Sequence, residues 1–417
     1  MTNNQNQPNQ YDVVLGGNAA PPIHGAVLGG IEGVKRRLAS SNVEAQIAAL
    51  KEALNYEKQG LNIVIQALED KRRKIRQAAV EFLQDRNEPQ AKSALKNYRF
   101  WDGFDERFYG YPCGHSTIFA NRRVIEFDIK TGIIETVNTA YAFRVSYDWY
   151  SKLYISLESK LQRLQQEQQK HLAKKVEALL FGYSENIEDV VFKALEKFTN
   201  LKAIFLGDIY QEECILYAIP LPRVSFILNS LPQLEILKIR GSSDFYSDIE
   251  TNVFNPFLKH DNLKALTIES DGLKREIFNQ VCQLELPALE YLELWTGSKY
   301  YISASDIKNI IPRIYYRFPK LKYLGLRNSE YSDEIAFALV DFPIIENLIE
   351  LNLSSGCLTD EGAEGLLNSP AIHQLDTLDI SDNYLSDEMV ERLTQLDIEV
   401  INIYQKHPDE RYCTVGE

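Results

Sequence analysis

The sequence predicts an α/β fold in which short strands and helices alternate as a right-handed solenoid, preceded by a small all-α module. Three observations carry this prediction. A Leu-x-x-Leu-x-Leu motif recurs from residue 201 onward, its copies begin at similar intervals, and helical patterns fill the region before residue 98. One such unit cannot bury its own apolar face, so the copies must stack on one another.

Seven copies of the motif are clear: Leu201–Leu206, Leu234–Ile239, Leu263–Ile268, Leu289–Leu294, Leu321–Leu326, Leu348–Leu353 and Leu375–Ile380. Their first residues lie 33, 29, 26, 32, 27 and 27 residues apart. Weaker copies begin at Val176 and Ile398. This spacing is typical of leucine-rich repeats at the long end of their range. Because such solenoids usually bind other molecules, we expect recognition rather than catalysis.

Helical patterns follow the later copies of the motif. Each begins with Ser or Thr and two acidic residues, which favours N-caps at Ser332, Thr359 and Ser386. The asparagine that usually closes the turn after each strand is present only as Asn383. Helices on the convex side, together with the long period, predict a horseshoe of the ribonuclease-inhibitor-like class.

The region before the motifs predicts helices at Ile31–Leu38, Val43–Asn55, Gly60–Glu69, Lys71–Gln84 and Glu88–Tyr98. Within it, the stretch Ile65–Leu83 resembles a HEAT-type repeat. Asp70 is placed to cap a helix, Arg76 to link neighbouring units, and Ala78 and Ala79 to allow close packing. The basic run Lys71–Lys74 either contacts an acidic partner or phosphate, or is a solvated turn.

We therefore expect four parts: a disordered tail over residues 1–24, the HEAT-like module over 25–98, a β-containing linker or N-terminal cap over 99–150, and the leucine-rich-repeat solenoid over 151–417. In the linker we expect strands at Ser116–Ala120, Arg123–Asp128, Gly132–Thr136 and Ala140–Asp148, with a hairpin turn at Lys130–Gly132. Leu153, Leu157, Leu161 and Leu164 predict one amphipathic helix that runs into Gln162–Gln169 and caps the solenoid.

The composition of the sequence indicates the cellular compartment in which the protein is found. The chain has 417 residues, and no run of apolar residues is long enough to span a membrane. The polar start Met1–Gln10 lacks the features of a signal peptide. The five cysteines are scattered without a CxxC pair, which is typical of reduced thiols. We expect a cytoplasmic protein that does not bind membranes.

Charge is distributed unevenly along the chain. The formal net charge of −14 combines +6 over residues 1–175 with −20 over residues 176–417. Between Asn328 and Gln405 the sequence has 17 carboxylates and one basic residue, Arg392, apart from histidine. This charge favours a protein partner with a basic surface and disfavours nucleic acid. Alternatively, it serves only to keep the solenoid in solution.

The third and fifth positions of each motif, and the position after it, face away from the buried leucines because side chains alternate along a strand. We call the surface made by these positions the concave face. The predicted partner-binding residues there are Arg240, Glu269, Tyr291, Glu293, Trp295, Tyr323 and Arg327. Trp, Tyr and Arg are the residue types that dominate interface energies. Glu350, Asp379 and Asp382 are predicted to attract the basic partner. The alternative is that these side chains pair with one another within the chain, as Arg240 with Glu269.

Five phrases of the sequence are not part of the general repeat pattern: Ala203–Ile209, Leu292–Trp295, Leu324–Ser329, Asp360–Ala363 and Arg411-Tyr412. Through them, residues 140–417 resemble a bacterial ribonuclease-inhibitor-like leucine-rich-repeat family of unassigned function. The resemblance implies the fold and no catalytic residues.

Known catalytic motifs are absent from the sequence: it has no P-loop, GxGxxG, HExxH or GxSxG pattern. Cys113 and His115 are one local pairing of a nucleophile type with a base type. HEAT-like repeats also resemble those of phycobilin lyases, so the alternative function is an accessory or lyase-like protein acting on phycobiliproteins. We expect no enzyme activity, no cofactor and no metal.

Overall fold

The computed structural model describes residues 30–70, 72–84, 86, 88–98, 114–148, 153–209, 216, 219–243, 252–407 and 411–413. The chain divides into two compact units, Met1–Asp105 and Glu106–Glu417. The predicted tail over residues 1–24 lies outside the described residues, as do Lys71 and Cys113. The division into four parts stays a prediction. None of the described helices is long and apolar enough to cross a lipid bilayer.

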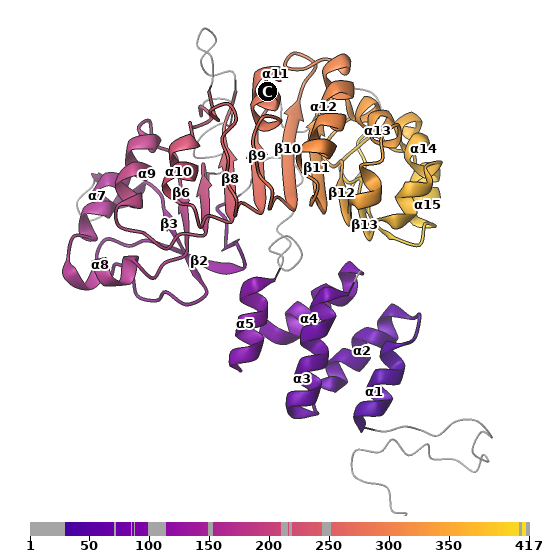
Figure 1. Cartoon of the computed structure of the whole chain (residues 1–417), viewed down its shortest axis with the longest axis horizontal. Helices are drawn as coiled ribbons and strands as arrows, with labels where there is room; N and C mark the ends of the chain where they lie inside the picture. The colour runs from indigo at the N-terminus through magenta and orange to yellow at the C-terminus, as the bar shows by residue number, and fades with distance from the viewer. Residues whose placement is uncertain are drawn as a thin grey trace, which may run out of the picture. The chain divides into compact units, whose positions relative to one another are not determined.

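The first unit is helical where the sequence predicts helices. Its elements are α1 (Gly30–Leu38), α2 (Val43–Ala53), α3 (Glu57–Gln66), the 3-10 turn η1 (Ala67–Glu69), α4 (Arg73–Gln84) and α5 (Pro89–Asn97) (Figure 1). The Asp70 carboxylate accepts a hydrogen bond from the Arg72 amide at 2.9 Å, directly before α4. Arg76 is fully buried and donates to the Asp70 carbonyl oxygen at 2.8 Å. This bond joins residues of one helical pair, and the HEAT-type character of the module stays a prediction.

The second unit contains a twelve-stranded sheet in the order β1-β2-β3-β6-β7-β8-β9-β10-β11-β12-β13-β14. The strands are β1 (Ile118–Phe119), β2 (Arg122–Glu126), β3 (Thr139–Phe143), β6 (Ala178–Phe181), β7 (Ala203–Leu206), β8 (Ile236–Arg240), β9 (Ala265–Glu269), β10 (Tyr291–Gly297), β11 (Tyr323–Ser329), β12 (Glu350–Asn352), β13 (Thr377–Asp379) and β14 (Glu399–Ile401). All neighbours from β2 to β14 are parallel. Every clear copy of the motif therefore forms a strand, as predicted, and the two weaker copies form β6 and β14.

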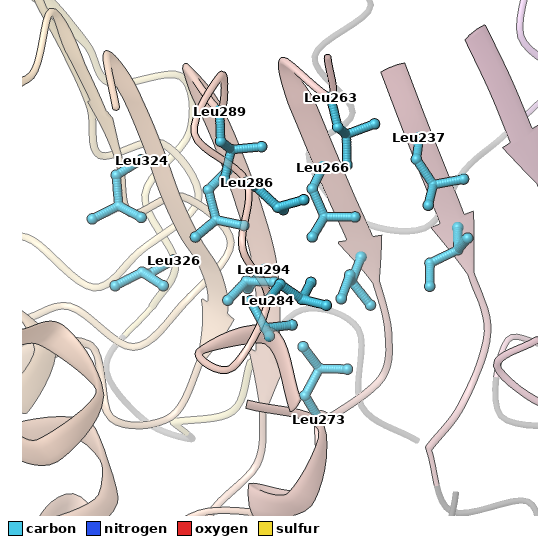
Figure 2. Close-up of a cluster of buried hydrophobic side chains, with 14 of the residues drawn as sticks. Leu237, Leu263, Leu266, Leu273, Leu284, Leu286, Leu289, Leu294, Leu324 and Leu326 are labelled. Atoms are coloured by element: carbon cyan, nitrogen blue, oxygen red, sulfur yellow. The ribbon is translucent and has the colours of Figure 1, made fainter. Parts of the chain in front are cut away.

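The motif leucines lie in register from strand to strand. Leu237 of β8 pairs with Leu266 of β9, which pairs with Leu292 of β10. Figure 2 shows Leu237, Leu266 and Leu324 of successive strands on the same side of the sheet, with Leu273 and Leu284 from the connecting segments beside them. Leu237, Leu266 and Leu292 have no exposed surface. The in-phase register is what buries one complete face of the sheet.

Helices cover the leucine face of the sheet, and in the later repeats they follow one another in the same order as the strands (Figure 1). They are α7 (Leu157–Arg163), α8 (Glu167–Ala173), α9 (Ile187–Leu195), α10 (Ser225–Ser230), α11 (Arg275–Val281), α12 (Ala304–Arg317), α13 (Ser332–Val340), α14 (Asp360–Leu367) and α15 (Asp387–Thr394). Thr359 and Ser386 cap α14 and α15 as predicted. The predicted cap at Ser332 is wrong, because Ser332 is the first residue of α13 and its hydroxyl donates to the Ser329 carbonyl oxygen.

The predicted strand Gly132–Thr136 and its hairpin are wrong. The strands β2 and β3 are parallel, so the segment between them crosses over instead of turning back. Its amides bond to side chains: Ile133 donates to Gln169 at 2.6 Å, and Ile134 donates to the Tyr141 hydroxyl at 3.0 Å. The predicted strand Ala140–Asp148 is divided into the end of β3 and β4 (Ser146–Asp148).

The single helix predicted from Leu153 onward is also wrong. Leu153 lies in β5 (Leu153–Ile155), which pairs with β4. Ser156 then caps α7 through a bond from the Ser159 amide, and α8 (Glu167–Ala173) follows as a separate helix. The two helices lie in the connection from β3 to β6, and β1 rather than a helix forms the N-terminal edge of the sheet. Because its apolar residues were spaced like those of a helix, periodicity did not reveal the strand.

Candidate functional site on the concave face

Glu293 is the centre of a buried polar cluster on the concave face. Strands β10 and β11 place Tyr291 beside Tyr323 and Trp295 beside Arg327. The Glu293 carboxylate accepts hydrogen bonds from both tyrosine hydroxyls at 2.8 and 2.7 Å, from Trp295 Nε1 at 2.9 Å and from Arg327 Nη1 at 3.2 Å. We call these five side chains the Glu293 cluster. Four donors around one carboxylate satisfy its hydrogen-bonding capacity.

Ring packing adds to these hydrogen bonds. The rings of Tyr291 and Tyr323 stack with centroids 3.9 Å apart, and the Arg327 guanidinium lies 5.0 Å from the centre of the Trp295 ring. Arg327 Nε donates to Ser354 Oγ at 2.8 Å, which links the cluster to the next repeat. Stacked rings and cation–π contacts favour this single arrangement of the side chains.

Burial and charge act in opposite directions on Glu293. Burial alone would raise the pKa of the Glu293 carboxyl, but the positive charge of Arg327 and the hydrogen bonds from Trp295 and Tyr323 outweigh it and hold this pKa below its usual range. Burial and the Glu293 charge raise the pKa of Tyr291 well above its usual value. Tyr291 is therefore a donor and the glutamate is an anion at neutral pH.

A second cluster lies on the neighbouring strand β9 and on β8 beyond it. Glu269 of β9 accepts from Arg240 Nε and pairs with Lys238 Nζ, each at 2.6 Å. The ammonium and guanidinium groups lie 4.6 and 5.1 Å from the centre of the Phe205 ring. Burial alone would raise the pKa of Glu269, but the charges of Arg240 and Lys238 lower it to about 2. This pairing of Arg240 with Glu269 is the alternative that the sequence left open.

The Glu269 cluster predicts a loss of stability in acid. Since the folded-state pKa of about 2 lies below the ordinary value of 4.5, the stabilisation is complete above pH 4.5 and is lost as the pH falls toward 2. The shift corresponds to about 3 kcal/mol. Denaturant unfolding across this pH range measures it, with Glu269→Gln as the reference. An equal pH dependence of the two proteins would contradict the prediction.

A partner-binding surface must be exposed to solvent, but the seven predicted binding residues are buried. None of these residues is more than 7% exposed, and Tyr291 is the most exposed of them. The seven are Arg240, Glu269, Tyr291, Glu293, Trp295, Tyr323 and Arg327. Two observations explain this burial. The side chains pair with one another across neighbouring strands, and Leu216, from the segment after β7, packs on Trp295. The binding role of these residues stays a prediction.

The three acidic residues predicted to attract a partner are also buried. Glu350, Asp379 and Asp382 are at most 5% exposed. Asp382 pairs with Lys406 at 3.6 Å, and Asp379 accepts from the Ser381 amide at 3.1 Å. The exposed carboxylates of the later repeats are instead Asp341, Glu346, Glu361, Asp387, Glu388, Glu391 and Asp397. Six of these seven lie on or beside the helices, and Asp397 precedes β14.

A buried ion pair at the N-terminal end of the sheet was missed in the sequence. Arg144 donates to the Asp208 carboxylate with Nε at 2.9 Å and Nη2 at 2.5 Å. The same carboxylate accepts from the Ser116 amide at 3.1 Å. Nearby, Phe119 packs on Phe205 with ring centroids 5.9 Å apart. These contacts place residues 116–119 against the concave side of the first repeats, and no periodicity in the sequence indicates them.

The described thiols do not resemble catalytic ones. Burial raises the pKa of Cys282 and Cys357 to about 11 and that of Cys413 to about 12. Cys113, the candidate nucleophile, lies outside the described residues. Among the described side chains, no group of three or more His, Cys, Asp and Glu is placed to hold a metal ion.

These thiols are predicted to resist alkylation while the protein is folded. In a Cys113→Ser/Cys214→Ser background, iodoacetamide at pH 8 should label the remaining thiols about a hundredfold more slowly than in the urea-unfolded chain, because few are thiolates and all are buried. Mass spectrometry of timed samples measures both rates. Equal labelling in the folded and unfolded chains would contradict the prediction.

Two solved structures are similar to this chain, one of them with a TM-score above 0.5. No protein-family model matches the chain, and no curated protein matches it. A solved structure of a Bacteroides fragilis protein is 25% identical, with a TM-score of 0.54, and the match covers 65% of this chain and 76% of that one. The leucine-rich repeat-containing protein LegL7 of Legionella pneumophila is 14% identical, with a TM-score of 0.42 and coverage of 69% and 92%. The chain has a leucine-rich-repeat fold.

Proposed function

We propose that this leucine-rich-repeat protein is a non-enzymatic recognition protein of the cytoplasm that binds a protein partner with a basic surface. The observation that carries the proposal is the exposed acidic surface of the last repeats. Between Asn328 and Gln405 the one Lys or Arg is Arg392, and it is paired with Glu364 at 2.5 Å. Opposite charges of this density accelerate the encounter with a basic partner.

A hollow between α14 and α15 supports the same proposal. It has a volume of about 380 Å³ and carries four carboxylates. Its lining residues are Asp360, Glu361, Glu364, Ser386, Glu388, Met389 and Arg392. A lysine or arginine of a partner fits such a surface by charge. The Glu293 cluster, by contrast, acts in this proposal as internal support for the strands that carry the repeats.

The finer features of the fold belong to the same proposal. The helices α12 to α15, each following a strand of the sheet, support a right-handed, ribonuclease-inhibitor-like horseshoe. The consecutive helices α2 to α5 support a HEAT-like module. No observation on the described residues favours the alternative role in phycobiliprotein chemistry.

The test is capture of partners from an extract of the source cells at low and high salt. The charge-reversed variant Glu361→Lys/Glu388→Lys should lose most of a basic partner that the wild type retains at low salt. The matched control Glu196→Lys/Glu285→Lys changes exposed carboxylates of earlier repeats by the same charge. Equal loss in both variants, or capture that persists at high salt, would count against the proposal.

A further inference from the structure

The last strand of the sheet has one unpaired edge. Within the described residues, β14 pairs with β13 alone. The Glu399 amide donates to the Asp376 carbonyl oxygen at 2.9 Å, and the Ile401 carbonyl oxygen accepts from the Ile380 amide at 2.8 Å. Because backbone groups alternate direction along a strand, the N–H and C=O of Val400 and Asn402 point away from β13. Among the described strands none pairs with this side of β14, so these groups can accept another strand.

The apolar core is less well covered at this edge than inside the sheet. Leu351 and Leu378, at the equivalent positions of β12 and β13, have no exposed surface, whereas Val400 and Ile398 are only partly buried. Just beyond β14, the side chains of Ile403 and Tyr404 are 57% and 69% exposed. A further strand with apolar side chains facing the helices would complete the burial of Val400.

The other face of β14 carries Glu399 and Ile401, and further acidic residues lie next to it. Glu399 lies in register with Thr377 on the concave face, and Asp397 and Asp376 precede the two strands. A second copy paired through β14 would bring these carboxylates together, which is unfavourable. The charge therefore favours a basic occupant over a copy of the chain.

We propose that β14 binds an extended segment of a partner protein as an added strand, in which apolar side chains facing the Val400 side alternate with basic side chains facing the Glu399 side. This inference rests on the proposed function and deepens it, since it names the form and composition of the partner segment. Backbone hydrogen bonds supply affinity in such strand addition, and alternate side chains supply specificity.

The experiment uses the full chain and a fluorescently labelled eight-residue peptide of alternating lysine and valine. Binding is measured by fluorescence anisotropy at low salt. The control peptide has the same sequence with alternate amides N-methylated, which removes the donors of one edge and keeps the charge. We expect N-methylation to weaken binding about tenfold or more, because the paired hydrogen bonds are lost.

Variants of the chain separate backbone pairing from charge. Val400→Pro removes the outward amide and is tolerated at an edge strand, whereas Val400→Thr keeps it. Glu399→Lys reverses the charge at the edge, and Glu361→Lys makes the same change in the acidic hollow of the proposed function. Glu196→Lys is the neutral control, because it changes an exposed carboxylate of an earlier repeat. We expect Val400→Pro and Glu399→Lys to weaken peptide binding about tenfold, with Val400→Thr and Glu196→Lys close to wild type. Thermal melts confirm that each variant is folded.

The outcomes separate the two proposals. Equal binding of both peptides, with Glu361→Lys as damaging as Glu399→Lys, would overturn strand addition and leave charge-based recognition standing. If the chain binds neither peptide but still captures a basic partner from the extract, strand addition is likewise overturned and charge-based recognition stands. Sedimentation could also show that the chain associates with itself and that Val400→Pro abolishes this association. That result would mean that β14 pairs with a second copy of the chain and not with a different protein.

Discussion

Replacing Glu293 with alanine is expected to lower the free energy of unfolding by about 3–5 kcal/mol, since one partner of a buried charge pair is removed. The guanidinium of Arg327, 5% exposed, would lose its anion. The hydroxyls of Tyr291 and Tyr323 and Trp295 Nε1 would lose the acceptor that they share. Urea denaturation of the two proteins at pH 7 measures the difference.

Two further variants show whether the loss comes from the unpaired charge. Glu293→Leu/Arg327→Leu removes both charges, so it should be less destabilised than the sum of the two single leucine substitutions. Glu196→Ala removes an exposed carboxylate of α9's C-cap and should change the free energy of unfolding by less than about 0.5 kcal/mol. If Glu293→Ala and Glu196→Ala unfold at the same urea concentration, the Glu293 cluster does not stabilise the sheet.

The strands were predictable because their determinant is local. Each Leu-x-x-Leu-x-Leu copy must present its leucines to one face, and alternation then assigns every other position to the opposite face. The alternation therefore predicts Leu266 and Leu324 in the core and Glu293 and Arg327 on the concave face, which is where the structure has them. The side-chain direction was right for all these residues.

The accessibility of the concave face was not predictable from the period, because it depends on contacts between distant parts of the chain. Leu216 packs on Trp295, and the Ser116 amide donates to Asp208. The residues of each pair are far apart in the sequence, and the repeat period does not predict that they meet. One signal was present in the sequence. Arg240 and Glu269 occupy equivalent positions of consecutive repeats, so opposite charges were bound to be cross-strand neighbours. This pairing of opposite charges predicts an internal network.

Replacing Gly297 with alanine is expected to lower the free energy of unfolding by about 2–5 kcal/mol, from backbone strain and steric overlap together. Gly297 ends β10 with a φ of +77°, a conformation that residues with a Cβ rarely adopt. A Cβ there would lie 2.2 Å from Gly272 Cα and 2.4 Å from the Asp271 carbonyl oxygen. Both are backbone atoms of the preceding repeat, so they cannot move aside as a side chain does.

The position also connects repeats on both sides, since the Gly297 carbonyl oxygen accepts from the Glu330 amide at 3.1 Å. If the Cβ pushes the turn at Gly297 away from the turn at Gly272, the packing of three consecutive repeats is weakened. In a stacked array each repeat is stabilised by its neighbours, so the adjacent repeats are destabilised as well. Gly114→Ala is the matched control, because a Cβ at Gly114 meets nothing within 4 Å. Thermal and urea unfolding should leave Gly114→Ala near wild type. A Gly297→Ala protein as stable as that control would show that the contact between the two turns is loose enough to admit a methyl group.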